Sequence, residues 1–193
     1  MKKLITILTV VALTTTVSFA QFSVKAGLNM ANIVSNNDDV DNGMKLGMII
    51  GANYNAELSD AMSLDVSVAF KQSGTKQTED FTGGSSTAKW ALNYLDISPS
   101  LSFNVSDAMA LSFGPYLAFA TSGKFTSETI ITNGPTTSSS ESIKFGDGDN
   151  DDGIKATDFG INIGTSFSIN DAMSVSAGYA LGLTNLFYID DDT

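Results

Sequence analysis

Three near-copies of one short phrase constrain the fold of this chain more than any other feature of its sequence. They occupy residues 58–64, 105–111 and 169–175, and each reads apolar, Ser or Asn, Asp, Ala, Met, small, apolar. Apolar residues alternate with polar or small ones before and after every copy. Because Asp and a preceding Ser or Asn bond their own backbone and tolerate turn dihedrals, each copy predicts the tip of a β-hairpin. The three turns are expected at Asp60, Asp107 and Asp171.

Alternation of period two predicts seven strands. The segment 44–58 alternates over fifteen residues, which is long for a strand of a soluble protein but ample for a tilted membrane strand of about 9 to 11 residues. The other six strands are expected to contain, in order, Phe22, Leu64, Leu95, Leu111, Phe159 and Val175. Short turns would join the strands at one end and long polar connections at the other, as in an all-β, antiparallel, up-and-down outer-membrane β-barrel.

The long connections are expected at residues 31–43, 73–89 and 121–157. They are rich in Gly, Ser, Thr, Asn and Asp, and they hold many of the acidic residues. This composition predicts flexible, solvated loops.

The first twenty residues are interpreted as a secretory signal peptide. A basic start at Lys2 and Lys3 precedes an apolar stretch and a small-x-small site that ends at Ala20. Residues 21–193 would then form one exported barrel domain located in the outer membrane.

The face opposite the apolar row carries charged residues of both signs, which we predict to form ion pairs inside a narrow lumen. These candidates are Lys25, Lys45, Glu57, Asp65, Lys71 and Asp96. A soluble lipocalin-like barrel would instead turn the bulky row inward around a ligand, and alternation alone leaves both arrangements open.

Aromatic residues favour the membrane arrangement. On the apolar face, one group lies close to the short turns and another lies close to the long connections, as in the two aromatic girdles of a membrane barrel. The first group is Tyr54, Phe103, Phe113 and Phe167, and the second is Phe70, Phe119 and Phe159.

Composition excludes several classes of function. After residue 20 the chain has eight Lys and no Arg against twenty-one acidic residues, a net charge of −13, so nucleic acid is not expected as a partner. The absence of His and Cys removes the usual nucleophile–base pairs and thiol chemistry, so we predict no enzyme activity and no organic cofactor. The expected partners are outer-membrane lipid, lipopolysaccharide and other envelope proteins.

An acidic segment resembles a calcium-binding loop. Asp147, Asp149, Asp151 and Asp158 are spaced so that oxygen ligands could alternate, but the glycine at 153 comes one residue late and an Asp stands where a Glu is usual. At most, weak binding of a divalent cation is predicted there.

Several segments together resemble the PorT-like outer-membrane β-barrel family of Gram-negative bacteria. They are residues 22–32, 94–99, 114–116 and 179–185, in this order along the chain. The resemblance implies an eight-stranded, side-chain-filled barrel, of which a final strand is not evident after residue 183. It also implies a part in envelope structure or in an envelope or secretion assembly. Alternatives from the residues are a surface recognition or adhesion protein acting through the long acidic loops, and a lipid-modifying enzyme, against which the absence of His argues.

Overall fold

A computed structural model describes residues 21–33, 43–146 and 154–186. Nearly all of these residues lie in β-strands, which follow one another along the chain. The strands are β1 (Phe22–Ala31), β2 (Gly43–Ser59), β3 (Met62–Phe81), β4 (Gly84–Ser106), β5 (Met109–Ile131), β6 (Thr136–Ser142), β7 (Phe145–Gly146), β8 (Ile154–Lys155), β9 (Thr157–Asn170) and β10 (Met173–Gly182). No helix among the described residues is long and apolar enough to cross a membrane.

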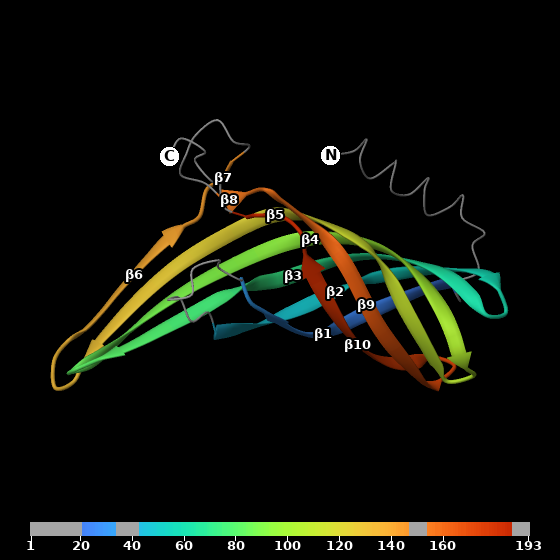
Figure 1. The fold of residues 1–193 in the computed structure, drawn as a ribbon, viewed down its shortest axis with the longest axis horizontal. Helices are drawn as coiled ribbons and strands as arrows, with labels where there is room; N and C mark the ends of the chain where they lie inside the picture. Colours follow the sequence, from blue (N-terminus) through green and yellow to red (C-terminus); the bar gives the residue numbers. More distant parts are fainter. Residues whose placement is uncertain (1–20, 34–42, 147–153, 187–193) are drawn as a thin grey trace, which may run out of the picture.

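One antiparallel sheet contains seven strands in the order β1-β2-β3-β4-β5-β9-β10, and β6 joins the same sheet through β5. Figure 1 shows this sheet curled into a half-barrel. Residues 109–119 of β5 pair with β9, whereas residues 124–130 of the same strand pair with β6. The all-β, up-and-down architecture predicted from alternation is therefore confirmed.

The barrel part of the described sheet has two edges, formed by β1 and β10. β1 pairs only with β2, and β10 pairs only with β9. All seven predicted strands are present, and the eighth strand expected from the family resemblance has no counterpart within the described residues.

Each repeated phrase forms a two-residue turn, as predicted. Asp60, Asp107 and Asp171 are each the first turn residue, followed by Ala. The pairing also skips one residue beside every turn, namely the first residue of each phrase, at Leu58, Val105 and Ile169. Two-residue turns that match the twist of a hairpin usually have residues with positive φ, and none of these turn residues has one. The β-bulge beside each turn supplies additional twist in all three copies.

The Ser or Asn of the phrase bonds the turn backbone. The Asn170 side-chain oxygen accepts hydrogen bonds of 2.9 Å from the backbone N–H groups of Ala172 and Met173. Ser106 Oγ accepts bonds of 3.4 and 3.2 Å from the equivalent groups of Ala108 and Met109. The repeat is therefore a local sequence code for one turn with its bulge.

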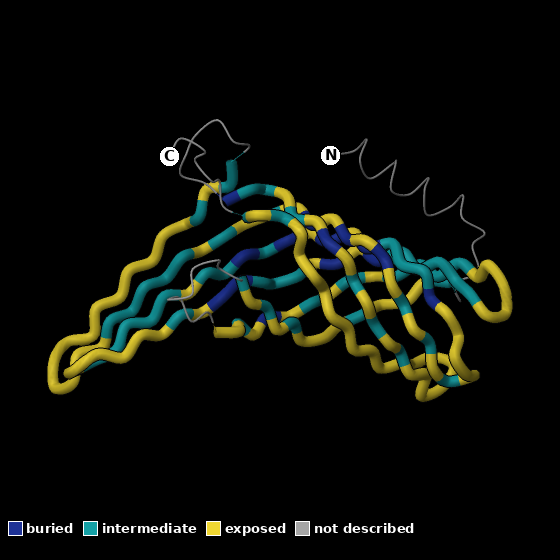
Figure 2. The backbone as a smooth tube through the Cα atoms, in the orientation of Figure 1, coloured by how far each residue is buried: buried dark blue, intermediate teal, exposed yellow. Residues whose placement is uncertain are grey.

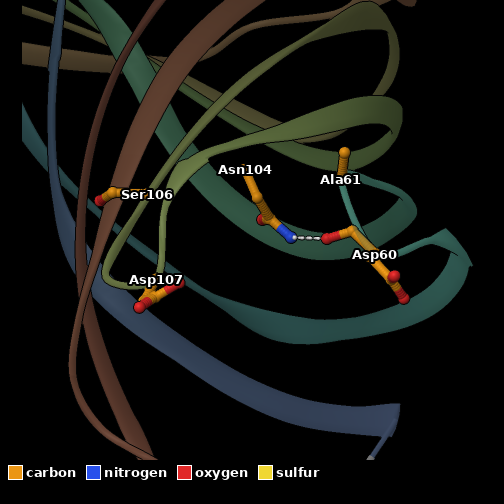
Figure 3. Close-up of a pocket in the computed structure, with 5 residues that line it drawn as sticks. All are labelled: Asp60, Ala61, Asn104, Ser106 and Asp107. Atoms are coloured by element: carbon orange, nitrogen blue, oxygen red, sulfur yellow. Dashed lines mark hydrogen bonds between the residues drawn. The ribbon is translucent and has the colours of Figure 1, made fainter.

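Neighbouring turns are also bonded to each other. Figure 3 shows Asn104, on the strand that leads to the second turn, donating through its side-chain amide to the carbonyl of Asp60 at 3.0 Å. The Asn104 backbone N–H donates to the carbonyl of Ala61 at 2.9 Å, and that of Ser168 donates to Ala108 at 2.8 Å. The turn end of the sheet is thus a continuous hydrogen-bonded rim.

The prediction of a flexible loop at residues 73–89 is wrong. β3 and β4 continue through this region without interruption and turn at Thr82 and Gly83, where Gly83 has a φ of 96°. Thr78 and Thr87 face each other across the strands, with hydroxyl oxygens 3.3 Å apart. Threonine favours strands and pairs across them, so a composition that is polar enough for a loop here forms a hairpin.

The loop predicted at 121–157 is wrong in the same way over its first half. β5 runs on to Ile131, and β6 folds back on it with Thr126 and Ser140 in register. The outer parts of β3, β4, β5 and β6 therefore form a polar sheet, called here the outer sheet, which projects from the half-barrel at the left of Figure 1. Residues 34–42 of the remaining predicted loop lie outside the described residues.

The strong curvature brings backbones close together at Gly114. A Cβ atom added there would overlap the carbonyl oxygen of Pro99 on β4, which is rigid backbone. At Gly27 on β1, by contrast, an added Cβ would meet only the Ile49 side chain at 3.5 Å, an ordinary contact.

We predict that Gly114→Ala impairs folding and that Gly27→Ala does not. Overpacking at the β4–β5 contact should cost about 1 to 3 kcal/mol, because the added Cβ would meet the backbone of Pro99 and Ser100 and not a flexible side chain. The measurement is the urea midpoint in lipid vesicles, followed by the faster gel migration of the unboiled barrel. Equal midpoints for the two variants would contradict the close approach.

Candidate functional site

The two faces of the sheet differ in the sense expected of a membrane barrel. On β4, Tyr94, Asp96 and Ser98 are buried on the concave face, whereas the intervening Leu95 and Ile97 are 42% and 37% exposed on the convex face. Figure 2 shows the same alternation along the central strands. A lipocalin-like barrel requires the bulky row inside, and the structure places it outside.

The exposed convex face is extensive. The members of the predicted aromatic girdles that are more than a third exposed lie on it, together with aliphatic residues of every main strand. The exposed aromatic residues of this set are Phe70, Phe103, Phe113, Phe119, Phe159 and Phe167. Apolar surface on this scale needs an apolar environment to cover it.

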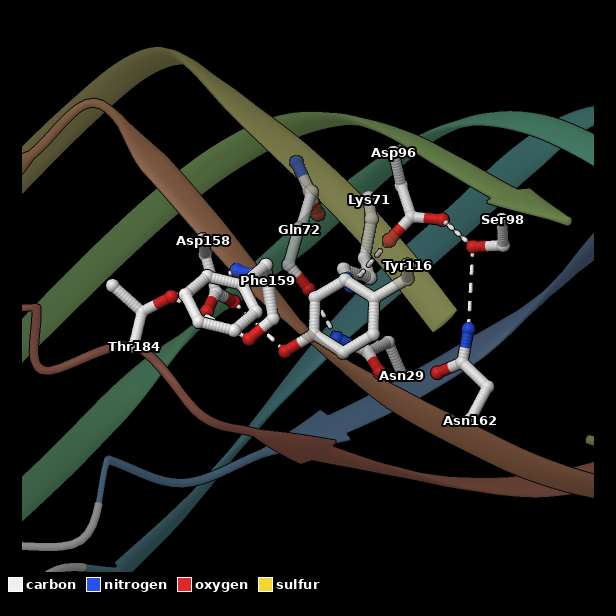
Figure 4. Close-up of polar contacts among 10 residues, drawn as sticks. All are labelled: Asn29, Lys71, Gln72, Asp96, Ser98, Tyr116, Asp158, Phe159, Asn162 and Thr184. Carbon is white, nitrogen blue, oxygen red and sulfur yellow. Dashed lines mark hydrogen bonds and ion pairs between the residues drawn. The ribbon is translucent and has the colours of Figure 1, made fainter. Parts of the chain in front are cut away.

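A buried ion pair lies at the centre of the concave face. Lys71 Nζ on β3 is 2.8 Å from Asp96 Oδ2 on β4, and their side chains are 14% and 5% exposed. Ser98 donates a hydrogen bond to the other carboxylate oxygen of Asp96, and Asn162 donates to Ser98 Oγ at 3.2 Å. Figure 4 shows this chain of contacts, which connects β3, β4 and β9.

The ion pair continues into a second polar contact. Lys71 Nζ lies 4.6 Å from the centre of the Tyr116 ring, in cation–π geometry. The Tyr116 hydroxyl donates to Asp158 Oδ2 at 3.0 Å, so β5 joins the network and β9 is connected to it a second time (Figure 4). The lysine therefore meets one carboxylate directly and a second through an aromatic ring.

The other predicted lumen residues are arranged differently from Lys71 and Asp96. Among the described residues, no lysine forms an ion pair with Asp65: Asn55 donates to it at 2.8 Å and Ser102 donates to its other oxygen, so the ion pair expected there is wrong. Neutral donors from both adjacent strands reach this carboxylate, and they satisfy it without a charge.

Three charged candidates take no ion pair within the described residues. Lys25 is half-buried on β1 and interacts electrostatically with Asp96 and Lys71 across the concave face. Lys45 is half-buried on β2, and Glu57 is exposed near the first turn. The concave face thus holds an excess of lysine at its β1–β2 side.

An apolar plug lies beside the polar network at the end away from the hairpin turns. Leu92, Ala118 and Ile154 are buried there together with the rings of Tyr94 and Tyr116. Partly buried residues pack against them from several segments, namely Ile33, Ala120, Ile143, Phe145 and Leu186. The plug was not expected from the sequence, because it combines residues of β4 and β5 with the short bridge formed by β7 and β8.

The residues of the predicted cation site are only partly described. Asp147, Asp149 and Asp151 lie outside the described residues, and Asp158 accepts the hydrogen bond from Tyr116 on the concave face. Within the described part of the chain, no group of three or more carboxylates is placed to hold a metal ion.

The comparison with protein families agrees with the arrangement of the two faces, in which the apolar side chains are outside and the polar side chains are inside. The family model described as the outer membrane protein beta-barrel domain matches residues 14–188. The chain belongs to this outer-membrane β-barrel family. It is accordingly an integral barrel protein of the outer membrane. No curated protein and no solved structure matches the chain.

For this outer-membrane barrel we predict that Asp96→Ala destabilises the fold by about 3 to 5 kcal/mol, because Lys71 would be left buried without its counter-ion. The double variant Lys71→Met with Asp96→Leu should recover most of the loss. Glu57→Gln, at an exposed carboxylate, is the matched control and should change stability by less than about 1 kcal/mol. Unfolding in urea from lipid vesicles provides the measurement, and no recovery in the double variant would contradict the pairing.

Proposed function

We propose that this barrel is a non-enzymatic protein with a closed polar lumen, which serves envelope structure or acts as an accessory of an envelope or secretion assembly. The observation that carries the proposal is the packing on the concave face, where the Lys71–Asp96 ion pair and the apolar plug are buried, as a side-chain-filled lumen requires. A role alongside PorT-like proteins is consistent with it and rests on the family resemblance.

The convex face supports outer-membrane lipid as the surrounding medium. Phe159 and Phe167 on β9 are both exposed and are eight residues apart, or roughly 20 Å along a barrel axis at the usual rise and tilt. Phe103 and Phe113 stack at the turn end with ring centres 6.1 Å apart. Aromatic residues at two heights match the two interfaces of the apolar layer.

The side chains of the lumen support a structural role over a catalytic one. Asp96, Asp65 and Asp158 each accept hydrogen bonds from neighbouring groups, which is what a packed interior requires. The sequence contains no His and no Cys to serve as base or nucleophile. The carboxylates are thus proposed to hold the barrel together.

The outer sheet favours a second function, recognition at the cell surface. The outer parts of β3 and β4 pair residue by residue along their full length, from Lys76 opposite Lys89 to Phe81 opposite Gly84. Cross-strand hydroxyl contacts such as Ser86 to Thr129, 3.4 Å apart, reinforce it. A stiff, projecting polar sheet loses little conformational entropy when it binds a partner, because its surface is already ordered.

We predict that the purified barrel, reconstituted into liposomes, admits no small sugars and gives no stable open conductance in planar bilayers. Unboiled protein in the same preparation should migrate faster than boiled protein, which establishes that the barrel is folded. Replacing Tyr94 and Tyr116 together by Ala should open a path if these rings fill the lumen. A large conductance from the folded natural chain would contradict the closed lumen.

Shortening the outer sheet separates the two proposed functions. Residues 77–88 are removed and Lys76 is joined to Lys89, its register partner, through Asn-Gly, and residues 127–139 are removed likewise between Thr126 and Ser140. We expect the barrel to keep its heat-modifiable band. Surface recognition predicts loss of binding to envelope material in pull-downs from cells, whereas unchanged binding would contradict it.

A further inference from the structure

A groove of about 420 Å³ lies where the outer sheet meets the apolar plug. It is lined by Trp90 on β4, Phe125 on β5, Glu141 and Ser142 on β6, and by Lys144 and Ile154. A volume of this size is in the range of small-molecule sites. Leu95 on β4 is the register partner of the girdle residues Phe70 and Phe119, and Trp90 lies five residues beyond it, roughly 13 Å along the barrel axis at the usual rise and tilt.

Two aromatic rings form a corner in the groove. Trp90 and Phe125 are direct register partners, and their rings lie 4.4 Å apart at an angle of 87°. Both residues are only half-buried. An indole that is fixed by its neighbour and still open on one side offers a rigid flat surface that loses little entropy on binding.

The rim of the groove is polar and carries both signs of charge. Glu141 is the register partner of Phe125 on β6, Ser142 follows it, and Lys144 comes two residues later. Within the described residues, no ion pair and no side-chain hydrogen bond engages Glu141 or Lys144. The groove therefore offers a carboxylate acceptor, an ammonium donor and a hydroxyl beside an apolar surface.

We propose that this groove binds an uncharged saccharide unit. A pyranose ring combines an apolar C–H face, which fits against the indole, with hydroxyl groups at its edge, which fit Glu141, Ser142 and Lys144. The opposite charges of Glu141 and Lys144 give the site no net attraction for an ion, and the net charge of −13 after residue 20 disfavours phosphate-bearing ligands. The inference rests on the proposed display of the outer sheet at the cell surface, where saccharides surround the barrel.

Trp90 is the only tryptophan of the chain, so its fluorescence reports on the groove directly. The experiment titrates the refolded full chain, in a detergent without a sugar headgroup, with maltose and with the disaccharide of N-acetylglucosamine. We expect a saturable change in emission for at least one of them, with a dissociation constant of about 1 mM. Phe125→Ala and Glu141→Gln should each weaken binding at least about tenfold.

Phe81→Ala is the matched control, because Phe81 is an exposed aromatic at the tip of the same sheet and lies outside the groove. It should bind as the natural chain does. Glu141→Gln keeps the test valid if Phe125→Ala fails to fold, since it preserves shape at an exposed position.

Absence of any emission change with either saccharide, in protein that still shows the folded band, would overturn the saccharide site and leave the proposed barrel function intact. A response to an apolar peptide and none to saccharides would also overturn it and would identify a peptide groove. Failure to form the folded band at all would instead count against the proposed function.

Discussion

Backbone pairing in lipid is the constraint on which the rest of this structure depends. A strand inside the hydrocarbon layer has no water for its N–H and C=O groups, so every strand must be bonded by neighbours, and its outward side chains must be apolar. The seven-strand antiparallel sheet meets this need across β2, β3, β4, β5 and β9, each of which has a partner on both sides. The same requirement makes the two edges, β1 and β10, the part of the described sheet that needs a further partner.

Turning the apolar face outward leaves the protein with a polar interior to stabilise. In the Lys71–Asp96 pair the two opposite charges compensate each other inside the barrel. Ser98 donates a hydrogen bond to Asp96, and the Tyr116 ring lies against Lys71, so both members have the further contacts that a buried ion pair requires. Curvature adds a second demand, since a narrow barrel brings backbones together and leaves no room for a Cβ at Gly114. The interior is thus specified by a few polar contacts and small residues rather than by an apolar core.

Much of this arrangement was predictable from sequence, because both the strand period and the turn code are local. Alternation places Lys71 and Asp96 on one face, and the repeated phrase places the turns at Asp60, Asp107 and Asp171. The hydrogen-bond partners of the lumen carboxylates were less predictable. Asn55 and Ser102 donate to Asp65, and which residues of the adjacent strands reach a carboxylate depends on the register between the strands. The outer sheet was missed because Ser and Thr fit a solvated loop and a paired strand equally well by composition. The plug at Leu92 and Ile154 joins residues distant in sequence, for which no local signal exists.

The central claim is that the convex face contacts lipid while the concave face is closed to it. Because the natural chain has no Cys, single cysteines can be placed from residue 159 to 167 on β9 and labelled with a nitroxide in lipid vesicles. Collision with dissolved oxygen, which concentrates in the hydrocarbon layer, then reports the surroundings of each label. The account predicts a period of two, with maxima at residues 159, 161, 163, 165 and 167, which lie on the convex face, and minima at the even-numbered residues between them. Maxima at Asn162 and Gly164, or no alternation, would contradict it.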